Sequence, residues 1–324
     1  MLLVEQEAEA RPAESPARPM ALKVVEFPTI HAMQKRHFFF LDVIPFLGFL
    51  AAFPLLARTG ITAFDWSVFV VMWFLTTVGI EIGYHRYFSH AAFKTSQAMK
   101  GLLTVLASVG GQGPVISWAA THRHHHEFSD KPEDSHSPHR YGPGFVAQVK
   151  GFFFSQIFWK RSYPFPNPGL YAKGLITDPL VTRLSKQYYV WVLLGLLVPA
   201  LLSFGHRGDL RGFLAGLALG GFIRLFACQQ GTFLINSLCH MFGSQPYKKR
   251  DASRNNFWFF LPSLGGSWHN NHHAFPFSAN NALHWWQLDP AYWVIALWAK
   301  LGLVWDVRTV KRELRPMPAR RMGS

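Results

Sequence analysis

The stretch Thr62-Ala-Phe-Asp-Trp-Ser-Val-Phe-Val-Val-Met-Trp-Phe-Leu-Thr-Thr-Val-Gly-Ile-Glu-Ile82 is almost entirely apolar and runs directly into Gly83-Tyr-His-Arg-Tyr-Phe-Ser-His90. Its length is close to the roughly 20 residues that a helix needs to cross the hydrocarbon core of a bilayer. Two histidines therefore follow a candidate membrane span at once. Neutral imidazole is the commonest nitrogen ligand of transition metals, so this junction predicts a metal-binding group at a membrane surface.

Three further stretches have the length and composition of membrane spans, and short connectors join the spans in pairs. We therefore expect an all-α integral membrane protein with four transmembrane helices in two hairpins. The predicted spans cover residues 38–56, 62–82, 187–204 and 212–235. The chain is 49% hydrophobic and contains 30 Phe and 12 Trp, which fits a membrane protein.

The charge distribution predicts how the chain is oriented. The formal net charge is +14, yet the only Lys or Arg residues in the connectors 57–61 and 205–211 are Arg58, Arg207 and Arg211. Since cytoplasmic loops carry the excess of Lys and Arg, we expect both termini and the remaining loops in the cytoplasm. The predicted parts are a disordered cytoplasmic tail over 1–34, a membrane domain over 35–310 whose helical cap comprises 83–186 and 236–310, and a basic C-terminal tail over 311–324.

Apolar stretches inside the cap predict further helices. Leu102–Ala120 is interrupted by Gly110-Gly-Gln-Gly-Pro114, and a fifth span here would put the first two histidine groups on opposite sides of the membrane. We therefore expect a re-entrant or interfacial helical pair. Phe145–Phe158 and His284–Leu303 are rich in aromatic residues and predict interfacial helices. Cys228 and Cys239 form no CxxC or iron–sulfur spacing, so we expect two ordinary membrane-segment cysteines.

Histidines recur beside the apolar segments in three groups and one isolated position. The groups are His85…His90, His122-Arg-His-His-His126 and His269-Asn-Asn-His-His273, and the isolated residue is His240 in Asn236-Ser-Leu-Cys-His240. The predicted topology puts all of them on one face of the membrane. A shared metal site requires this placement.

The spacing within each group limits how its side chains can converge. In a helix, His122, His125 and His126 share one face and can serve one metal or two neighbouring metals. His269, His272 and His273 repeat that spacing. His85 and His90 would lie about 140° apart on an ideal α-helix, so we expect an unwound helix or an approach to the metal from two sides.

The other histidines do not fit the pattern. His124 points away from the face of its neighbours, and His136 and His139 lie in a polar loop that contains proline. Histidines 31, 37, 206 and 284 are isolated. For all of these we expect surface or supporting positions.

The ligand set narrows the choice of metal. Histidines without carboxylates or thiolates suit iron, copper or zinc. His126-Glu-Phe-Ser-Asp130 lacks the second histidine of a zinc-protease HExxH motif. Zinc needs only three or four ligands, whereas nine imidazoles fit two metals with open positions. We therefore expect a redox pair of metals that activates dioxygen.

The motif order HxxxxH, HxxHH, NSxxH and HNxHH resembles the membrane fatty acyl desaturases of the stearoyl-CoA delta-9 type, and most of all their bacterial members. The strings that carry the resemblance are Gly83–His90, Trp118-Ala-Ala-Thr-His-Arg-His-His-His126, Asn236-Ser-Leu-Cys-His-Met-Phe-Gly243 and Trp268-His-Asn-Asn-His-His-Ala-Phe-Pro276. The similarity runs from about residue 35 to 310.

The resemblance implies a di-iron enzyme that uses dioxygen and two electrons to place a cis double bond, by family default delta-9, in a saturated long-chain fatty acyl thioester or lipid. It implies a bacterial inner-membrane location and no catalytic side chain beyond the metal centre. Gln112 and Trp118 match residues around the bent acyl chain, and Asn236 would reach a metal through water. The implied iron ligands are His85, His90, His122, His125, His126, His240, His269, His272 and His273.

Three departures from the family pattern bear on these roles. Gly265-Gly266-Ser267 stands where bacterial members usually have Gly-Glu-Ser, so a carboxylate that could orient an imidazole is missing there. Gln229–Gln230 replaces a His-His pair. Ala120 and Thr121 replace the Arg and Asp with which animal members contact coenzyme A. The acyl carrier therefore stays open between coenzyme A, acyl carrier protein and a glycerolipid.

The chain has no HPGG haem signature, no Gly-rich flavin or nicotinamide fingerprint and no ferredoxin cysteine pattern. We therefore expect an external electron donor, a ferredoxin or a cytochrome with its reductase, which the basic cytoplasmic face would steer. The basic residues are separated by apolar spans, which argues against nucleic-acid binding.

Two other functions remain open from the sequence. A related di-iron hydroxylase or oxygenase would use the same histidines. A membrane metal transporter or sensor would need a polar path through the spans. The polar residues of the spans are too few and too scattered for such a path, namely Asp65, Glu81, Arg224 and Gln229–Gln230.

Overall fold

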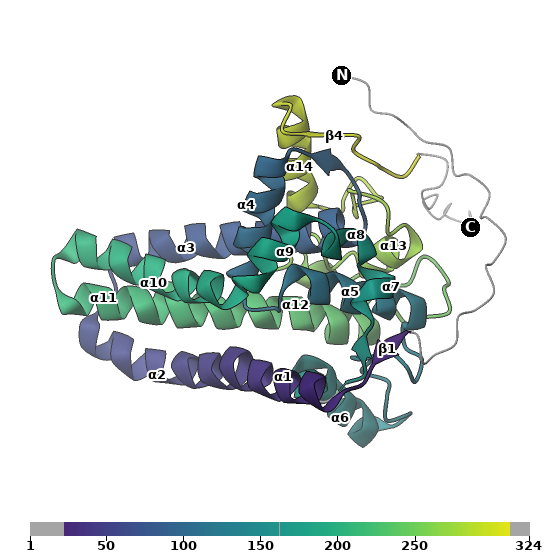
Figure 1. Cartoon of the computed structure of the whole chain (residues 1–324), viewed down its shortest axis with the longest axis horizontal. Helices are drawn as coiled ribbons and strands as arrows, with labels where there is room; N and C mark the ends of the chain where they lie inside the picture. Colours follow the sequence, from purple (N-terminus) through teal and green to yellow (C-terminus); the bar gives the residue numbers. More distant parts are fainter. Residues whose placement is uncertain (1–22, 162, 312–324) are drawn as a thin grey trace, which may run out of the picture.

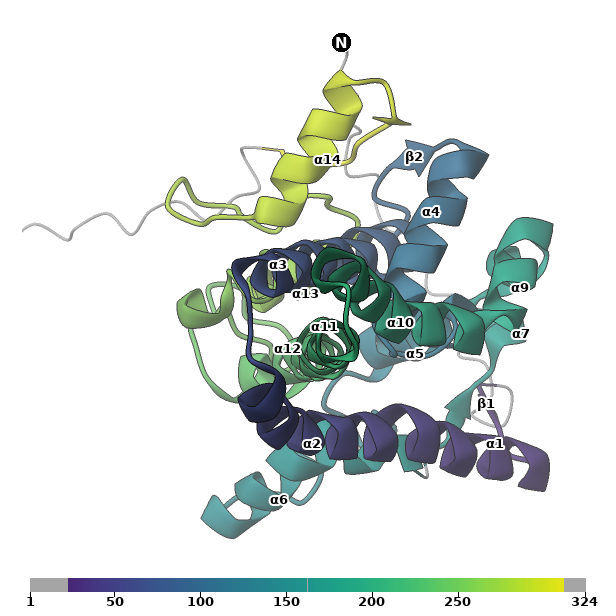
Figure 2. The same ribbon diagram turned by 90° about the vertical axis from the view of Figure 1, so that its left-hand side faces the viewer.

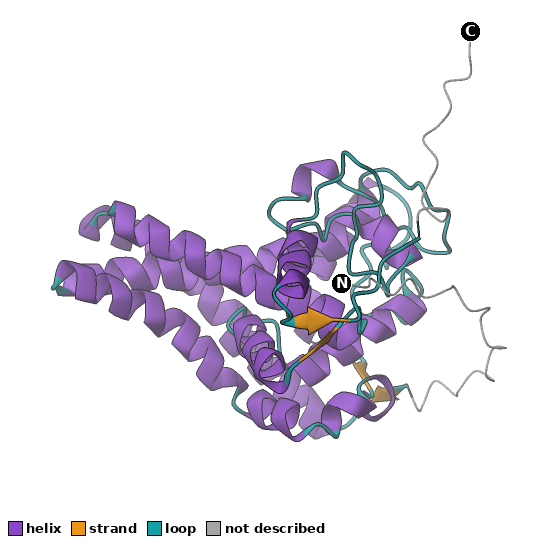
Figure 3. Ribbon diagram, turned by 90° about the horizontal axis from the view of Figure 1, so that it is seen from above, coloured by secondary structure: helices purple, strands orange, loops and turns teal. Residues whose placement is uncertain are grey.

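The computed structural model describes residues 23–161 and 163–311, and it is mostly helical. Long helices run side by side, and shorter helices form a cap at one end of the bundle (Figure 1). The two small antiparallel sheets lie in the cap region (Figure 3). The elements are β1 (Val24–Val25), α1 (Pro28–Phe38), η2 (Phe39–Val43), α2 (Ile44–Thr59), α3 (Ala63–Val78), η3 (Gly79–Ser89), β2 (Lys94–Thr95), α4 (Gln97–Ser108), α5 (Val115–Phe128), α6 (Phe145–Gln156), η4 (Phe158–Arg161), β3 (Phe165–Pro166), α7 (Pro168–Tyr171), α8 (Lys173–Ile176), α9 (Pro179–Lys186), α10 (Tyr188–Arg207), α11 (Leu210–Gly216), η5 (Leu217–Ile223), α12 (Arg224–Met241), η6 (Phe257–Phe259), α13 (His269–Ala274), α14 (Pro290–Lys300) and β4 (Val304–Trp305).

Among the described residues, four continuous helices are long and apolar enough to cross a membrane, and they match the four predicted spans to within a residue at the start of the second and third. They cover Pro28–Thr59, Ala63–Ser89, Tyr188–Arg207 and Leu210–Met241. Many large apolar side chains on them are exposed, as expected where lipid replaces water. Seen along the bundle, α11 and α12 lie between α2 on one side and α3 and α10 on the other (Figure 2).

The N-terminal prediction was wrong over part of its length. Residues 24–34 were expected in a disordered tail, but β1 pairs with β3 and α1 begins at Pro28. Proline at the first position suits a helix start, and the basic residues in the last turn of α1 complement the helix dipole. Residues 1–22 of that tail, and 312–324 of the predicted C-terminal tail, lie outside the described residues.

The helices predicted in the cap are present, but the last of them begins later in the chain than predicted. The helical pair predicted over 102–120 is α4 and α5, separated at 109–114, and the helix predicted over 145–158 is α6, which ends at Gln156. The helix predicted over 284–303 covers only Pro290–Lys300. Asp289 accepts a hydrogen bond from the Tyr292 backbone N–H and thereby starts the helix there.

The long helix of α3 and η3 packs tightly on α4 because a glycine lies at the contact. A Cβ on Gly79 would lie 2.4 Å from the Ala107 backbone nitrogen, a distance that no side chain allows. This close approach holds the histidine-bearing end of η3 against the cap and the buried apolar core around Ile82 and Leu103.

Buried polar residues of the spans serve the backbone. Pro199 in α10 has no N–H to donate to the Gly195 carbonyl, and Arg224 Nη2 donates to that carbonyl at 2.8 Å. Arg224 also bonds the carbonyls of Gly220 and Val109. Gln229 bonds the Leu41 and Gly111 carbonyls in the same way. Arg224 and Gln229 thus donate hydrogen bonds to backbone carbonyl groups, which lipid chains cannot do.

We predict that Arg224→Leu destabilises the fold. The change leaves the Gly195 carbonyl without a donor and removes the hydrogen bonds to the Gly220 and Val109 carbonyls, at a cost of about 3 kcal/mol or more. Thermal unfolding of the purified protein should show a clear decrease in Tm. Arg211→Leu, at an exposed position, is the matched control. An unchanged Tm for the Arg224 variant would contradict this account.

Candidate metal centre

Five of the histidines meet in what we call the first cluster: His85, His90, His122, His126 and His272. His122 Nε2 lies 2.8 Å from His90 Nε2 and 3.1 Å from His126 Nε2. His272 Nε2 lies 3.0 Å from the Nε2 atoms of both His85 and His126. Segments far apart in the sequence thus bring one ligand atom each to a common point.

The other four form the second cluster: His125, His240, His269 and His273. His269 Nε2 lies 3.0 Å from the Nε2 atoms of His240 and His273. One nitrogen from each of the four rings lies within 4.8 Å of those of the others. The rings of His126 and His273 stack at 4.4 Å, so the two clusters are adjacent.

A π-helix explains how His85 and His90 join the same cluster. Segment η3 (Gly79–Ser89) closes its turns with i→i+5 hydrogen bonds, and His90 is its C-cap. Residues five positions apart then lie close in angle, and the two ring centres are 5.2 Å apart. The helix is therefore widened here, rather than unwound or approached by the metal from two sides as the five-residue spacing predicts.

The HxxHH motifs divide their histidines between the clusters. On α5, His122 and His126 join the first cluster and His125 the second. On α13, His272 joins the first cluster, and His269 and His273 join the second. Each short helix therefore serves both clusters, which is the two-metal alternative of the sequence analysis.

Carboxylates lie behind four of the rings, and sequence reasoning did not assign them to the site. The Nδ1 atoms of His85, His125 and His240 donate to Glu81, Asp134 and Asp130 at 3.1, 3.0 and 2.8 Å, and His273 Nδ1 lies 3.4 Å from Asp251. A hydrogen on Nδ1 leaves the lone pair on Nε2, which faces the cluster. The i,i+4 spacing of Glu81 and His85 was a usable signal, whereas the loop carboxylates gave none.

The electrostatics favour the neutral form of six of the nine clustered histidines. Burial, and then the neighbouring imidazoles, lower the pKa of these six rings well below the usual histidine range. Burial also lowers the pKa of His125, but the Asp134 carboxylate outweighs it and the net shift is upward. The six rings of the two clusters whose pKa is lowered are His90, His122, His126, His269, His272 and His273. Neutral imidazole is the form that binds a metal.

The residues fit a pair of transition-metal ions. Two nitrogens bound at right angles, each about 2.1 Å from a metal, lie about 3 Å apart, which is the separation between neighbouring Nε2 atoms here. His125 Nε2 is buried without a hydrogen-bond partner among the described residues, as expected of a lone pair aimed at a cation. Both clusters are therefore candidate metal sites.

The remaining histidines of the cap lie outside the two clusters, as expected. His124 is buried against Phe128 and Tyr171. His136 stacks on His125 at 4.4 Å, and burial followed by His125 lowers its pKa to about 3. His139 Nε2 donates to the His240 carbonyl at 2.9 Å. His136 and His139 thus support the second cluster.

Gly266 and Glu81 lie against each other. A Cβ on Gly266 would lie 2.7 Å from Glu81 Oε1 and 2.9 Å from Ile235 Cδ1. Gly266 is the position at which the family pattern has a carboxylate that this chain lacks. The second span supplies the carboxylate of Glu81 at the same place, because the absence of a side chain at Gly266 makes room for it.

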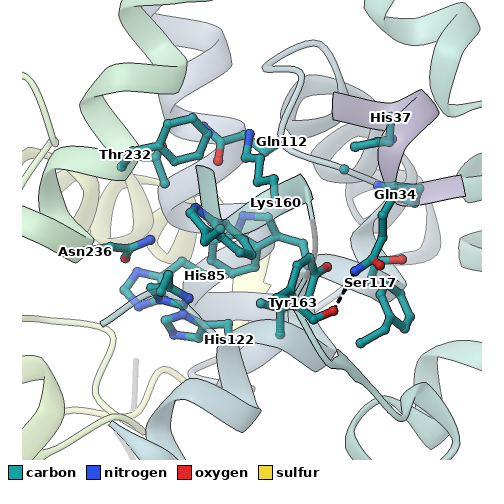
Figure 4. A pocket seen from close by; sticks show the side chains of 18 of the residues that line it. Gln34, His37, His85, Gln112, Ser117, His122, Lys160, Tyr163, Thr232 and Asn236 are labelled. Carbon is teal, nitrogen blue, oxygen red and sulfur yellow. Dashed lines mark hydrogen bonds between the residues drawn. The ribbon is translucent and has the colours of Figure 1, made fainter. Parts of the chain in front are cut away.

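A cavity runs between exposed residues of α1 and α10 and the histidines (Figure 4). Met33 and Tyr189 at its mouth are 38% and 43% exposed, whereas Glu81 and His269 at its closed end are 4% and 2% exposed. Of the residues predicted to meet substrate or water, Gln112, Trp118 and Asn236 all line it. The Trp118 ring also stacks on His122 at 4.9 Å.

These features describe a helical membrane protein with a cavity that ends at two candidate metal sites, and comparison with known proteins agrees. A model of the family described as "Fatty acid desaturase" matches residues 64–309. The chain therefore belongs to the fatty acid desaturase family, and it is an oxidoreductase of fatty acyl chains.

Curated relatives cover most of the chain. A hex-5-enoyl-[acyl-carrier protein] acetylenase of Moorena producens is 41% identical over 90% of this chain and 92% of its own length. Delta-9 acyl-lipid desaturase 1 of Arabidopsis thaliana is 33% identical over 88% of this chain and 89% of its own length. The chloroplastic palmitoyl-monogalactosyldiacylglycerol delta-7 desaturase of that plant is 32% identical over 76% of this chain and 63% of its own length.

We predict that Gly266→Ala weakens metal binding about 10- to 100-fold, because the new methyl group displaces Glu81 from His85. Glu81→Ala should have the same effect, and Glu81→Ala with Gly266→Glu should restore part of the loss by bringing a carboxylate from the other side. Metal content and affinity are measured on the purified protein. Gly174→Ala, in open space, is the control. Wild-type affinity in both single variants would refute the role of Glu81.

Removal of one ring from either cluster should lower the metal content of the protein. We expect His272→Ala and His125→Ala each to bind less metal than the wild type and to lose activity, because each deletes a nitrogen from a different cluster. Elemental analysis of purified protein provides the readout, with His206→Ala, an exposed ring outside the clusters, as control. A variant with unaltered metal content and full activity would rule out a shared site.

Proposed function

We propose that this chain is an oxygen-dependent fatty acyl desaturase that introduces a cis double bond, by default delta-9, at a di-iron centre. One observation carries the proposal: two histidine clusters lie side by side at the closed end of a largely apolar cavity. The cavity can hold an extended hydrocarbon chain, and its closed end puts one part of that chain beside both candidate metal sites.

The nine clustered histidines would hold two iron ions, with Asn236 contacting one of them through water. Bound iron would supply the oxidising chemistry that breaks unactivated C–H bonds, which no acidic or basic side chain can do. The residues of the chain position the substrate and exclude water. Gln112 and Trp118 line the cavity, Trp118 against the first cluster, and both would fix the bend of the acyl chain.

The reaction consumes dioxygen and two electrons, and a separate ferredoxin or cytochrome with its reductase would supply the electrons. The basic surface of the cap, with exposed Lys248, Lys249 and Arg250, would attract an acidic donor. The excess of positive charge on this side would orient the cap and both termini toward the cytoplasm, in the inner membrane of a bacterium.

The relatives favour two carriers and a second reaction. The names of two relatives specify lipid-linked acyl chains, and the name of a third specifies an acetylenase that acts on a hex-5-enoyl chain carried by acyl carrier protein. The identity of 41% to that acetylenase makes dehydrogenation of a terminal alkenoyl chain the second candidate function. Both reactions remove two hydrogens from adjacent carbons.

Fatty acid analysis tests the proposal directly. The chain is expressed with a compatible electron donor in a host without aerobic desaturases, and total fatty acids with derivatised double bonds are analysed by gas chromatography–mass spectrometry. We expect a new monounsaturated acid that forms only with oxygen and gives the chain length and bond position. The control is the His272→Ala variant.

Other products would change the assignment. An alkyne formed only when a terminal alkenoic acid is fed would establish the acetylenase reaction, and a hydroxy acid would establish a hydroxylase. No new lipid, with iron bound and electrons demonstrably delivered, would refute an acyl substrate and reopen metal transport or sensing.

A further inference from the structure

The cavity contains a buried cation that neither histidine cluster uses. Lys160, in η4, is 8% exposed and lines the cavity. Its Nζ donates to Asp42 Oδ1 at 2.7 Å and lies 3.9 Å from the centre of the Phe233 ring. An ammonium group has three N–H donors, and these two contacts leave at least one free. Burial lowers the pKa of Lys160, and Asp42 opposes that shift.

The residue next to Lys160 presents a second unused donor. Trp159 is 8% exposed and lines the same cavity, and its Nε1–H has no hydrogen-bond partner among the described residues. Gln34 also lines the cavity, and its Nε2 donates to the Tyr163 carbonyl (Figure 4). A buried N–H without an acceptor costs free energy, so a polar ligand that accepts from it would bind with a net gain.

These donors lie near the candidate metal sites. The Trp159 ring contacts the His136 ring at 5.1 Å, and His136 stacks on His125 of the second cluster at 4.4 Å. The Trp159 ring is therefore linked to the second cluster through one intervening ring, that of His136. An acyl chain fixed at that point extends its methylenes toward the closed end.

We infer that Lys160 and Trp159 form a carbonyl-binding clasp for the thioester or ester carbonyl oxygen of the acyl substrate. This inference rests on the proposed function and adds the site that holds the polar end of the substrate. By fixing the carbonyl, the clasp sets which carbon pair reaches the histidines.

The charge balance of the clasp selects a neutral ligand. Asp42 already neutralises Lys160, so a free carboxylate would bring a second anion into a buried site that has one cation. A carbonyl oxygen is an uncharged acceptor with two lone pairs, and it can accept from the ammonium and the indole together. The clasp therefore takes an acyl thioester or ester rather than a free fatty acid.

Equilibrium binding to the purified full-length protein tests this without turnover. The probes are hexanoyl and stearoyl N-acetylcysteamine thioesters, the matching oxyesters, and thioethers in which a methylene replaces the carbonyl. We expect the wild type to bind the carbonyl compounds about tenfold or more tightly than the thioethers, as for a hydrogen bond to a charged donor. A preference for thioester indicates a carrier thioester as the source, and equal binding of the oxyester indicates an ester lipid.

Variants separate the clasp from packing. Trp159→Phe removes the N–H and keeps a ring, and we expect it to reduce the discrimination to about twofold. Lys160→Met leaves Asp42 buried without its partner, so Asp42→Leu with Lys160→Met is tested beside it. Lys150→Met, at an exposed position on α6, is the matched control and should keep the wild-type ratio.

Two results would overturn the clasp: equal wild-type binding of thioester and thioether, or undiminished discrimination in both Trp159→Phe and the double variant. Failure of the proposed function looks different. A protein that discriminates carbonyl compounds but forms no unsaturated product keeps the clasp and loses the desaturase assignment. A protein that desaturates without discriminating keeps the assignment and loses the clasp.

Discussion

The convergence of nine imidazole lone pairs on two adjacent points is the constraint on which the rest of the structure depends. Each ring must be buried, neutral and rotated so that Nε2 faces the cluster, and each of these conditions opposes free solvation. Carboxylates on the far nitrogens of His85, His125 and His240 fix the tautomer that exposes the Nε2 lone pair. The cap loops that carry Asp130 and Asp134 are therefore as necessary to the centre as the helices that carry the histidines.

The same constraint explains the irregular parts of the helices. A regular α-helix through η3 would separate His85 and His90 in angle, and the widened π-helical turns bring them together. Within the spans, Arg224 donates to the Gly195 carbonyl that Pro199 leaves unpaired. The first feature brings two ligands to one cluster, and the second pairs a backbone carbonyl that a proline in the next turn leaves without a donor.

Much of the site could be predicted because its ligands are encoded locally. The HxxHH spacing on a helix predicts which histidine side chains share a face, and the four apolar stretches predict that all histidine groups lie on one side of the membrane. The partners of the histidines could not be predicted, because they are set by contacts between distant segments. Asp251 lies beside His273 and Asp130 beside His240 only after the cap has folded. The extent of α1 and the late start of α14 were missed because pairing with β3 and the Asp289 cap outweighed composition.

Glu81 and Lys160 illustrate how a membrane protein can keep charge in an apolar cavity. Burying an ion is expensive unless a partner lies within hydrogen-bond reach, and each of these residues has one, His85 for Glu81 and Asp42 for Lys160. Each also needs space: Glu81 occupies the volume that Gly266 leaves empty, and Lys160 lies over the face of Phe233. A carboxylate at the closed end can orient a ligand ring, whereas a neutralised cation nearer the mouth can donate to an uncharged acceptor. The positions of the two charges thus divide the cavity into an end that suits a metal centre and a middle that suits the polar group of an acyl chain.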